Sequence, residues 1–324
     1  MRPTGRQHLG NYFGAVVNFV KMQDLFNGYF FVADYHSLTT HPNPADLRAQ
    51  SKNIAIVYLA CGVDPNKCAL YLQSDLPQIP ELYLILNMLA YKGELEREAT
   101  FKEKAREKPD NVNAGLLTYP VLMTADIIIH KAHKVPVGKD QQQHLEMSRD
   151  FVRRFNNMYK VEYFPEPAAF SFSDKLVNVP SLDGDGKMSK SKPDHTCIYL
   201  EDSPDDIRKK IKRMVTDSGP TEPNSVKPPI IQNVFDIMAL VSTKETIQHF
   251  EDTYNNCTIR YGDMKKQLGD DMVNFLTPIR EKIIELNDDE KKVYEILGDG
   301  GSKARASASQ TLKDVREIIG IKSF

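Results

Sequence analysis

The sequence lacks several features that would point to a particular class of protein at once. Its 324 residues include no tryptophan, so the fluorescence of the chain comes from its fourteen tyrosines alone. No run of eighteen apolar residues is present, which predicts that no segment spans a membrane. The first residues contain no apolar core of a secretory signal, so we expect a cytoplasmic protein.

Cysteines are few, and the net charge is small. Only four cysteines occur and none forms a Cys-x-x-Cys pair, which is typical of reduced thiols in a reducing compartment. His130 and His133 lie three residues apart, but no third ligand stands near them, so we predict no metal site. The net charge of −2 means that any binding of nucleic acid must depend on local basic patches.

The first part of the chain alternates strand and helix patterns. Residues 29–32 and 68–74 are short apolar runs of the kind found in buried strands. Between them, residues 44–61 carry apolar side chains near a 3.6-residue period and stop before Gly62, which predicts a helix. A further helix is expected over residues 79–93, ending at a glycine. This order predicts an α/β fold with a doubly wound parallel sheet.

The next part of the chain is predicted to form helices and one short strand. The first half of the charged segment 94–113 suggests an exposed helix. An apolar helix is expected over residues 119–130, then a short strand over 134–138 and an amphipathic helix from about Gln141.

Beyond residue 200 the chain has almost no strand pattern. Ser203 and Pro204, followed by two acids, predict a helix start. Residues 217–229 hold four of the nineteen prolines and favour a linker. We therefore predict a helical second domain after the α/β domain.

The stretch LDGDGKMSKS, residues 182–191, has neither a helix nor a strand period. Gly184 and Gly186 favour turns, and lysines and serines are common on solvated surface loops. The same residues would also suit a loop that closes over a polyanion, because lysine ammonium groups bind phosphate as point charges. The stretch alone does not decide between the two interpretations.

A second glycine-containing stretch, PTGRQHLGNYFGA, spans residues 3–15. Its glycines allow close approach of the backbone, and Asn11 begins a helix-like segment that ends near Lys21. The free N–H groups at a helix start, with His8 beside them, would suit an anion. A turn followed by a helix cap explains the pattern equally well, and the stretch is neither a P-loop nor a dinucleotide fingerprint.

An acidic residue lies within the apolar segment 119–130. Tyr119, Met123 and Asp126 stand at i, i+4 and i+7, so they share one face of the expected helix. An acid in such surroundings needs a hydrogen-bond partner, because burying it unpaired is costly. The partner is either a backbone or arginine group of the chain or a donor on a ligand.

These stretches carry a resemblance. HLGN (8–11) resembles the first signature of the class I aminoacyl-tRNA synthetases, and KMSKS (187–191) is identical to their second signature. The strings GELERE, LLTYPVLMTADI and VPVGKDQQQHLEMSRDFVRRFN are similar to those of the tryptophanyl-tRNA synthetase family of bacterial type. The resemblance covers nearly the whole chain and is weakest in the C-terminal third. The tyrosyl-tRNA synthetases share both signatures.

The resemblance implies a ligase that activates L-tryptophan with ATP to tryptophanyl-adenylate and transfers the acyl group to tRNA(Trp), releasing AMP and diphosphate. It implies ATP with Mg²⁺ and a homodimer. It further implies a Rossmann-like catalytic domain of residues 1–186 and 290–324, and a helical anticodon-binding domain of residues 187–289. A tyrosyl-tRNA synthetase is the alternative enzyme, and a non-catalytic RNA-binding paralogue is the alternative of another class.

The resemblance also implies a set of site residues. Four of them are expected to act on the phosphates during catalysis: Lys187, Lys190, Lys104 and His8. The ATP-binding residues are expected to be Arg2, Pro3, Thr4, Gly10, Asn11, Gly138, Lys139, Asp140, Val179, Lys187, Met188, Ser189, Lys190 and Ser191. The tryptophan-binding residues are expected to be Asp126, Tyr119, Met123, His36, Val135, Val137 and Gln141.

The amino-acid pocket bears most directly on specificity. Asp126 is expected to accept a hydrogen bond from the indole N–H, which is a donor only. Tyrosyl relatives tend to have glutamine where Met123 stands, so the methionine favours an apolar substrate ring.

Two further expectations follow from the resemblance. The face formed by Arg208, Lys209, Lys212 and Arg213 is expected to follow tRNA phosphates, although a solvated face explains the same pattern. In the family a strand precedes the RPTG turn and none does here, so we expect a strand to be missing from the sequence.

Overall fold

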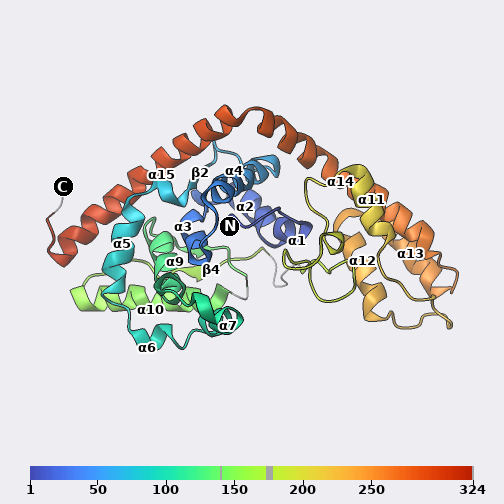
Figure 1. The fold of residues 1–324 in the computed structure, drawn as a ribbon, viewed down its shortest axis with the longest axis horizontal. Helices are drawn as coiled ribbons and strands as arrows, with labels where there is room; N and C mark the ends of the chain where they lie inside the picture. Colours follow the sequence, from blue (N-terminus) through green and yellow to red (C-terminus); the bar gives the residue numbers. More distant parts are fainter. Residues whose placement is uncertain (139–140, 173–177, 323–324) are drawn as a thin grey trace. The chain divides into compact units, whose positions relative to one another are not determined.

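A computed structural model describes residues 1–138, 141–172 and 178–322 of the chain (Figure 1). By their internal contacts the residues divide into two compact units. Unit 1 comprises Met1–Thr4, Asn18–Leu176 and Glu290–Phe324, and unit 2 comprises Gly5–Val17 and Val177–Asp289. The functional division into a catalytic and an anticodon-binding domain stays a prediction.

Parallel strands form the sheets of unit 1. Strand β1 (Gly28–Val32) pairs with β2 (Cys68–Leu72) in parallel, and helix α4 (Pro44–Ala60) connects them, which confirms the predicted strand–helix–strand unit. Asn43 caps α4 by accepting a hydrogen bond from the Ala45 N–H, and Gly62 follows the helix with a φ of 103°. Strand β3 (Lys134–Val135) pairs with β4 (Ala168–Ala169), so the predicted strand over residues 134–138 is shorter than expected.

The long helices of unit 1 surround these strands. Helix α9 (Tyr119–Ile128) and helix α10 (Gln142–Tyr159) form close to where the sequence predicts them. The predicted helix over residues 79–93 is wrong in its second half, because α5 (Gln78–Asn87) ends six residues before Gly93. The backbone turns there with short-range bonds, from Leu89 N–H to Leu86 O and from Ala90 N–H to Asn87 O.

The last helix of the chain, α15 (Glu290–Ile319), lies along β2 and also contacts α4 and α5 (Figure 1). It approaches the strand very closely at Gly300. A Cβ atom on this residue would stand 1.9 Å from the Leu70 carbonyl oxygen. The absence of a side chain at Gly300 is therefore what allows the helix to touch the backbone of β2.

The shorter helices of unit 1 connect these elements. They are α3 (Asp34–Ser37), η2 (Leu38–Thr40), η3 (Gln73–Asp75), α6 (Lys92–Leu95), α7 (Ala99–Glu107), η4 (Pro109–Asn111) and α8 (Ala114–Leu117). Helix α7 corresponds to the exposed helix that the charged segment predicts, because none of its residues is buried.

Unit 2 is helical, as the sequence predicts. Its helices are α1 (Leu9–Asn11), the π-helical turn η1 (Tyr12–Val16), η6 (Asp194–Thr196), α11 (Pro204–Lys212), α12 (Pro229–Val241), α13 (Lys244–Asn255) and α14 (Tyr261–Asp288). The Ser203 hydroxyl caps α11 by accepting from the Asp206 N–H, which confirms the predicted start.

Two details of unit 2 concern its boundaries. The first helix begins at Leu9, so the prediction that it starts at Asn11 is wrong by two residues. Residues 213–228 form neither helix nor strand, in agreement with the predicted linker. After η1 the chain continues into α2 (Val17–Met22).

In the ranges that the structure describes, no helix has the length and apolar character needed to cross a membrane.

Candidate active site

The buried carboxylate of Asp126 on α9 is the centre of a polar cluster in unit 1. Its Oδ2 atom lies 2.8 Å from Nε2 of His36. The side-chain amide of Gln73 donates to both oxygens, at 2.7 Å and 2.9 Å. All three side chains are buried, with exposed fractions of 6% or less. The expectation that this acid finds a polar partner is confirmed, but the partners within the chain are His36 and Gln73 rather than a backbone or arginine group.

The topology of the sheet explains why these residues meet. His36 follows β1 and Gln73 follows β2, and the carboxyl ends of neighbouring parallel strands lie at the same edge of a sheet. A second bond joins the same loops, from the Ser74 N–H to Oδ1 of Asp34 at 3.1 Å. Sequence reasoning missed Gln73, although a polar residue directly after a buried strand was the signal that could have identified it.

Two buried atoms of this cluster have no hydrogen-bond partner among the described residues: Nδ1 of His36 and Oε1 of Gln73. When Nε2 of His36 donates to the carboxylate, Nδ1 is left as an acceptor, and the amide oxygen of Gln73 is an acceptor as well. Burial raises the pKa of Asp126, while the bonds from His36 and Gln73 oppose that rise. The cluster therefore offers acceptors and suits a ligand that brings N–H or O–H donors.

Aromatic and apolar side chains adjoin the cluster. The ring of Tyr119 lies 4.2 Å from that of His36 between centroids, so two of the predicted pocket residues are in contact. The partly buried side chains of Met123, Val135 and Val137 pack against the hydrophobic core of unit 1. For the two valines, this position fits both a pocket wall and an ordinary place at the edge of the core.

The predicted pocket residue Gln141 is linked to the start of α7 through His144 and Glu98. Its Oε1 atom lies 3.0 Å from Nδ1 of His144, and Nε2 of His144 lies 3.3 Å from the buried carboxylate of Glu98. Glu98 in turn caps α7 by accepting from the N–H groups of Thr100 and Phe101. Sequence reasoning missed both His144 and Glu98, because their contact joins residues more than forty positions apart.

Lys104 stands on the exposed face of α7. Its ammonium group pairs with Glu107 at 2.7 Å, and about half of its side chain is exposed. Gly138 is partly buried, and its carbonyl accepts from the Gln141 N–H at 3.1 Å. Lys139 and Asp140 lie outside the described residues. The predicted roles of these residues in binding ATP stay predictions.

Arg2, Pro3 and Thr4 also belong to unit 1. The Thr4 N–H donates to the carbonyl of Arg2 at 2.9 Å, which forms a tight turn, and Pro3 within it is buried. The Nε atom of Arg2 is buried and has no hydrogen-bond partner among the described residues. A donor of this kind would be satisfied by an anionic ligand.

In unit 2 the HLGN stretch is held by an extended segment that follows the KMSKS loop. His8 forms an isolated antiparallel bridge with Tyr199, and the Leu9 N–H donates to the carbonyl of Ile198 at 2.9 Å. The Asn11 side chain accepts from the His8 N–H at 3.1 Å. Gly10 lies against the imidazole, since a Cβ atom there would stand 2.9 Å from the ring.

His8 is buried and has a free ring nitrogen. Burial first, and then the charges of Lys190 and Lys187, lower its pKa from 6.5 to about 4. Its Nδ1 atom has no hydrogen-bond partner in the described part of the chain. The imidazole is therefore neutral near pH 7, and its predicted role on the phosphates stays a prediction.

The KMSKS stretch is anchored at its start. Pro180 and Lys187 form an antiparallel bridge, and the Met188 N–H donates to the carbonyl of Val179 at 2.9 Å. The Met188 side chain is buried, whereas Lys187 is exposed. The backbone of the loop is thus fixed at one end by pairing rather than left as a free surface turn.

The middle of the loop carries two serine hydroxyls and the ammonium group of Lys190. Ser189 and Ser191 lie 2.8 Å apart between their hydroxyl oxygens. Lys190 is partly buried, and burial lowers its pKa from 10.5 to about 8. A partly desolvated ammonium favours binding of an anion, so the polyanion interpretation of this loop fits better than that of a solvated turn.

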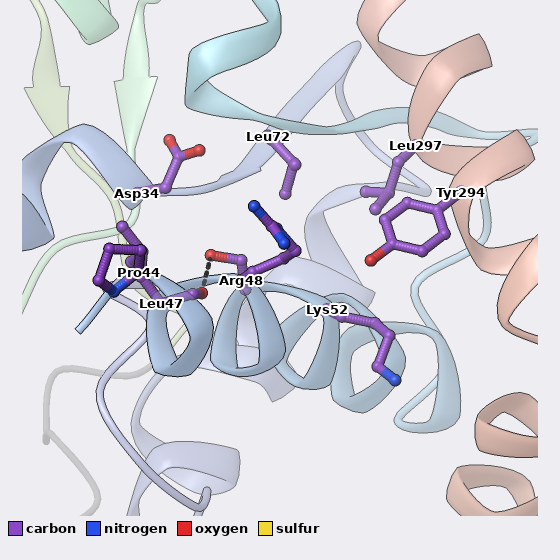
Figure 2. A pocket seen from close by; sticks show the side chains of 9 residues that line it. Asp34, Pro44, Leu47, Arg48, Lys52, Leu72, Tyr294 and Leu297 are labelled. Carbon is purple, nitrogen blue, oxygen red and sulfur yellow. Dashed lines mark hydrogen bonds between the residues drawn. The ribbon is translucent and has the colours of Figure 1, made fainter. Parts of the chain in front are cut away.

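A separate pocket of about 320 Å³ lies in unit 1. Figure 2 shows Arg48 and Lys52 projecting from α4, with Tyr294 and Leu297 coming from α15. Its remaining lining residues are Asp34, Pro44, Leu47, Ser51 and Leu72. None of the predicted site residues that the structure describes lines this pocket, so it is not the predicted substrate site.

No group of three metal-ligating side chains occurs within residues 1–138, 141–172 and 178–322. His130 has other partners, because its ring stacks on Tyr29 with centroids 3.9 Å apart and its nitrogens face Tyr71 and Ser307.

Comparison with known proteins decides the family. The family model of class I tRNA synthetases (W and Y) matches residues 1–277. The chain belongs to this family. It is 55% identical over 322 residues to a tryptophan–tRNA ligase of Porphyromonas gingivalis, which covers 99% of this chain and 98% of the relative. It is 39% identical to the tryptophan–tRNA ligase of Helicobacter pylori over 326 residues, which covers 99% and 97% of the two chains.

A solved structure agrees with these relatives. The tryptophanyl-tRNA synthetase of Campylobacter jejuni, complexed with ADP and tryptophan, superimposes with a TM-score of 0.87 at 34% identity. The match covers 99% of this chain and 98% of the other. The class I synthetase fold with a Rossmann-like parallel core, which the sequence predicts, is thereby confirmed.

Proposed function

We propose that this chain activates L-tryptophan with ATP and transfers the product, tryptophanyl-adenylate, to tRNA(Trp), releasing AMP and diphosphate. The names of its relatives support the substrate, and the ADP and tryptophan bound to the Campylobacter enzyme support ATP as the nucleotide. The single observation that carries the proposal is the buried cluster of Asp126, His36 and Gln73 beside apolar pocket residues.

Tryptophan suits this cluster because its ring combines a large apolar surface with one N–H donor. Asp126 accepts the indole N–H, and the hydrogen bonds from Gln73 and His36 hold its carboxylate in place. Tyr119 and Met123 cover the ring, and Val135, Val137 and Gln141 complete the pocket. The thioether of Met123 offers no hydrogen bond of the strength that a phenol would need, which favours tryptophan over tyrosine.

Activation requires the tryptophan carboxylate to attack the α-phosphorus of ATP in line, while negative charge develops on the leaving pyrophosphate. Lys187 and Lys190 neutralise that charge, and Lys104 adds a third cation. The hydroxyls of Ser189 and Ser191 donate to phosphate oxygens. His8 contributes its neutral imidazole to the phosphates and ribose.

Further residues complete the proposed ATP site. They are Arg2, Pro3, Thr4, Gly10, Asn11, Gly138, Lys139, Asp140, Val179 and Met188. Mg²⁺ enters as part of the ATP complex, held mainly by phosphate oxygens and water. The described residues provide no cluster of ligands for it, and we assign it no protein ligand and no step.

We further propose a homodimer and a tRNA-binding face. The large apolar side chains of Leu84 on α5 and of Met88 and Tyr91 just after it are 57–75% exposed, so a second copy of the chain would cover them. The basic side chains of Arg208, Lys209 and Lys212 on α11 and of Arg213 just after it are exposed and would bind tRNA phosphates, and Arg208 pairs with Asp270 at 2.9 Å.

Replacing Asp126 by alanine tests the amino-acid specificity. We expect tryptophan binding to weaken by about 1.5–3 kcal/mol, the contribution of a charged hydrogen bond. The preference for tryptophan over analogues whose ring lacks the N–H should shrink as well, because a buried acceptor rejects such analogues. Since the chain contains no tryptophan, binding is read directly from the emission of the substrate indole.

Two controls accompany this experiment. Asp126→Asn keeps the shape of the side chain and shows whether the charge matters beyond folding. Asp150→Ala removes an exposed acid on α10 and should leave tryptophan binding unchanged. Full tryptophan affinity and full discrimination in Asp126→Ala would mean that the carboxylate is only a structural acid.

A further inference from the structure

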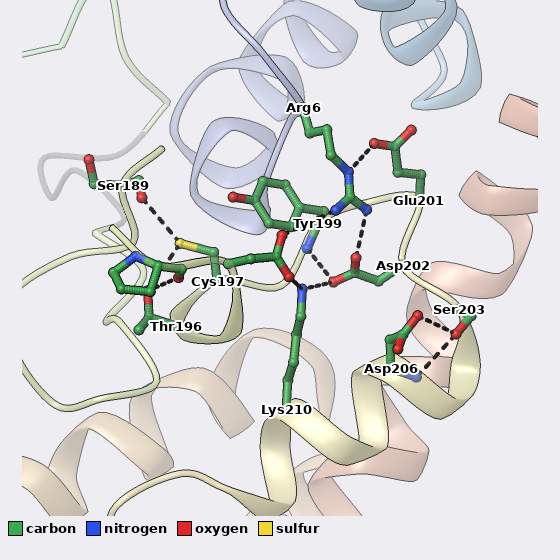
Figure 3. Close-up of polar contacts among 12 residues, drawn as sticks. Arg6, Ser189, Thr196, Cys197, Tyr199, Glu201, Asp202, Ser203, Asp206 and Lys210 are labelled. Atoms are coloured by element: carbon green, nitrogen blue, oxygen red, sulfur yellow. Dashed lines mark hydrogen bonds and ion pairs between the residues drawn. The ribbon is translucent and has the colours of Figure 1, made fainter. Parts of the chain in front are cut away.

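The buried carboxylate of Asp202 occupies the centre of an ion network in unit 2 (Figure 3). Its Oδ1 atom accepts from the Arg6 guanidinium at 2.7 Å, and its Oδ2 atom accepts from the Lys210 ammonium at 2.8 Å. The Tyr199 N–H donates to Oδ2 as well, at 3.0 Å. The side chains of Asp202 and Lys210 are only 4% and 9% exposed, so solvent screens this pair little, whereas Arg6 is 43% exposed.

The two cations also enclose an aromatic ring. The Arg6 guanidinium carbon lies 4.3 Å from the centroid of the Tyr199 ring, and the Lys210 ammonium lies 4.8 Å from it. Both cations reach Asp194, at 3.3 Å and 2.9 Å. The network therefore joins three segments that are distant in sequence: the residues before His8, the residues after Ser191, and α11.

The segment that Asp202 holds, residues 196–200, touches both signature stretches. On one side it pairs with residues 7–9, through Leu9 N–H to Ile198 O and Leu200 N–H to Gln7 O. On the other side the buried thiol of Cys197 donates to the carbonyl of Ser189, at 3.4 Å (Figure 3). The segment is thus a connection through which His8 and the KMSKS loop keep a fixed relation to each other.

We propose that Asp202 is a positioning residue for the activation step, an inference that rests on the proposed function. It touches no substrate group. It fixes the segment 196–200, and through that segment the imidazole of His8 and the backbone next to Lys190. Without the carboxylate, the Tyr199 N–H loses its acceptor, and the nearly buried Lys210 and the half-exposed Arg6 lose the charge that they share.

A network of this kind has a simpler alternative, which is that it only stabilises unit 2. The two roles differ in what they change. A loss of stability alone lowers the amount of folded enzyme and leaves the properties of each folded molecule intact. A loss of positioning lowers the rate per folded molecule, while the tryptophan pocket in unit 1 keeps its affinity.

The test replaces Asp202 by asparagine, with Glu201→Gln as the matched control. Glu201 is the neighbouring residue and pairs with the same Arg6, but it is exposed to solvent, so its loss should change little. For Asp202→Asn we expect the kcat of tryptophan-dependent ATP–pyrophosphate exchange to fall by about 10- to 100-fold, the scale of a small misplacement of reacting groups. Tryptophan affinity, read from indole emission, should stay within about twofold of the wild type.

Limited trypsin digestion of the full chain gives a readout that does not depend on activity. Cleavage after Lys187 or Lys190, well below the melting temperature, should be faster in Asp202→Asn than in the wild type and in Glu201→Gln. Lys210→Met should have the same effects, and combining it with Asp202→Asn should add little, because the two residues act together.

The outcomes separate this inference from the proposed function. If the wild type exchanges no pyrophosphate with tryptophan, the proposed function is wrong, and the digestion still tests whether Asp202 holds the loop. If the wild type is active but Asp202→Asn keeps its kcat and its cleavage rate, Asp202 is not a positioning residue. Equal effects of Glu201→Gln and Asp202→Asn, or a parallel loss of tryptophan affinity, would also overturn the proposal.

Discussion

Alanine in place of Lys190 should cost roughly 2–4 kcal/mol of transition-state stabilisation, the usual scale for deleting one electrostatic contact. The reason is that Lys190 is partly buried, so its ammonium acts on the leaving pyrophosphate in a medium that screens charge weakly. Tryptophan affinity should change little, because the indole contacts are made elsewhere. Lys187→Ala should act in the same direction. The measurement is tryptophan-dependent pyrophosphate exchange together with tryptophan binding.

The pH dependence of the same residue provides an independent check. Burial lowers the pKa of Lys190 to about 8, so its ammonium is charged below that pH and loses the charge above it. The kcat/KM for ATP should therefore fall as the pH rises through about 8. An arginine keeps its charge to much higher pH. In Lys190→Arg the fall of kcat/KM for ATP should therefore begin at a higher pH than in the wild type, even if the absolute rate is lower. An unchanged alkaline limb in Lys190→Arg, or equal losses of rate and tryptophan affinity in Lys190→Ala, would remove Lys190 from the catalytic step.

The largest loss of stability should come from Gly300→Ala on α15. The added Cβ atom would stand 1.9 Å from the carbonyl oxygen of Leu70 and 2.7 Å from its carbonyl carbon. These are backbone atoms of strand β2, which is paired with β1 and has no flexible end that can move aside. We expect the protein to lose about 1–3 kcal/mol or more, the scale of overpacking a well-packed contact.

The control for this substitution lies in the same helix. A Cβ atom on Gly298 would meet nothing within 4 Å, so Gly298→Ala should stabilise the helix by roughly 1 kcal/mol through its higher propensity. Thermal and urea unfolding should show a lower free energy of unfolding than the wild type for Gly300→Ala and a higher one for Gly298→Ala. A Gly300→Ala variant as stable as Gly298→Ala would mean that α15 does not approach β2 as closely as described.

The sequence was sufficient for features that depend on neighbouring residues. The apolar run at residues 29–32 and the cap at Ser203 are local; the structure has the cap where it was predicted and a strand over Gly28–Val32, one residue longer than predicted. The two signature stretches are also local, and the structure pairs each of them with backbone of unit 2.

The contacts between distant residues could not be predicted in the same way. Gln73 contacts Asp126, which lies 53 positions further along the sequence, and Gly300 contacts Leu70, which is much more distant in the sequence. The hydrophobic periodicity of the sequence does not reveal either contact, because each contact depends on how the strands and helices are arranged in space. The error at α5 has a related origin, since its apolar pattern continues past Asn87 while the backbone turns away from the helix.

The most direct test of the account is amino-acid-dependent ATP–pyrophosphate exchange with tryptophan and tyrosine measured side by side on the wild-type chain. The account predicts exchange with tryptophan and far weaker exchange with tyrosine, because the buried acceptors around Asp126 and the apolar side chain of Met123 suit an indole. Faster exchange with tyrosine, or none with either amino acid, would contradict it.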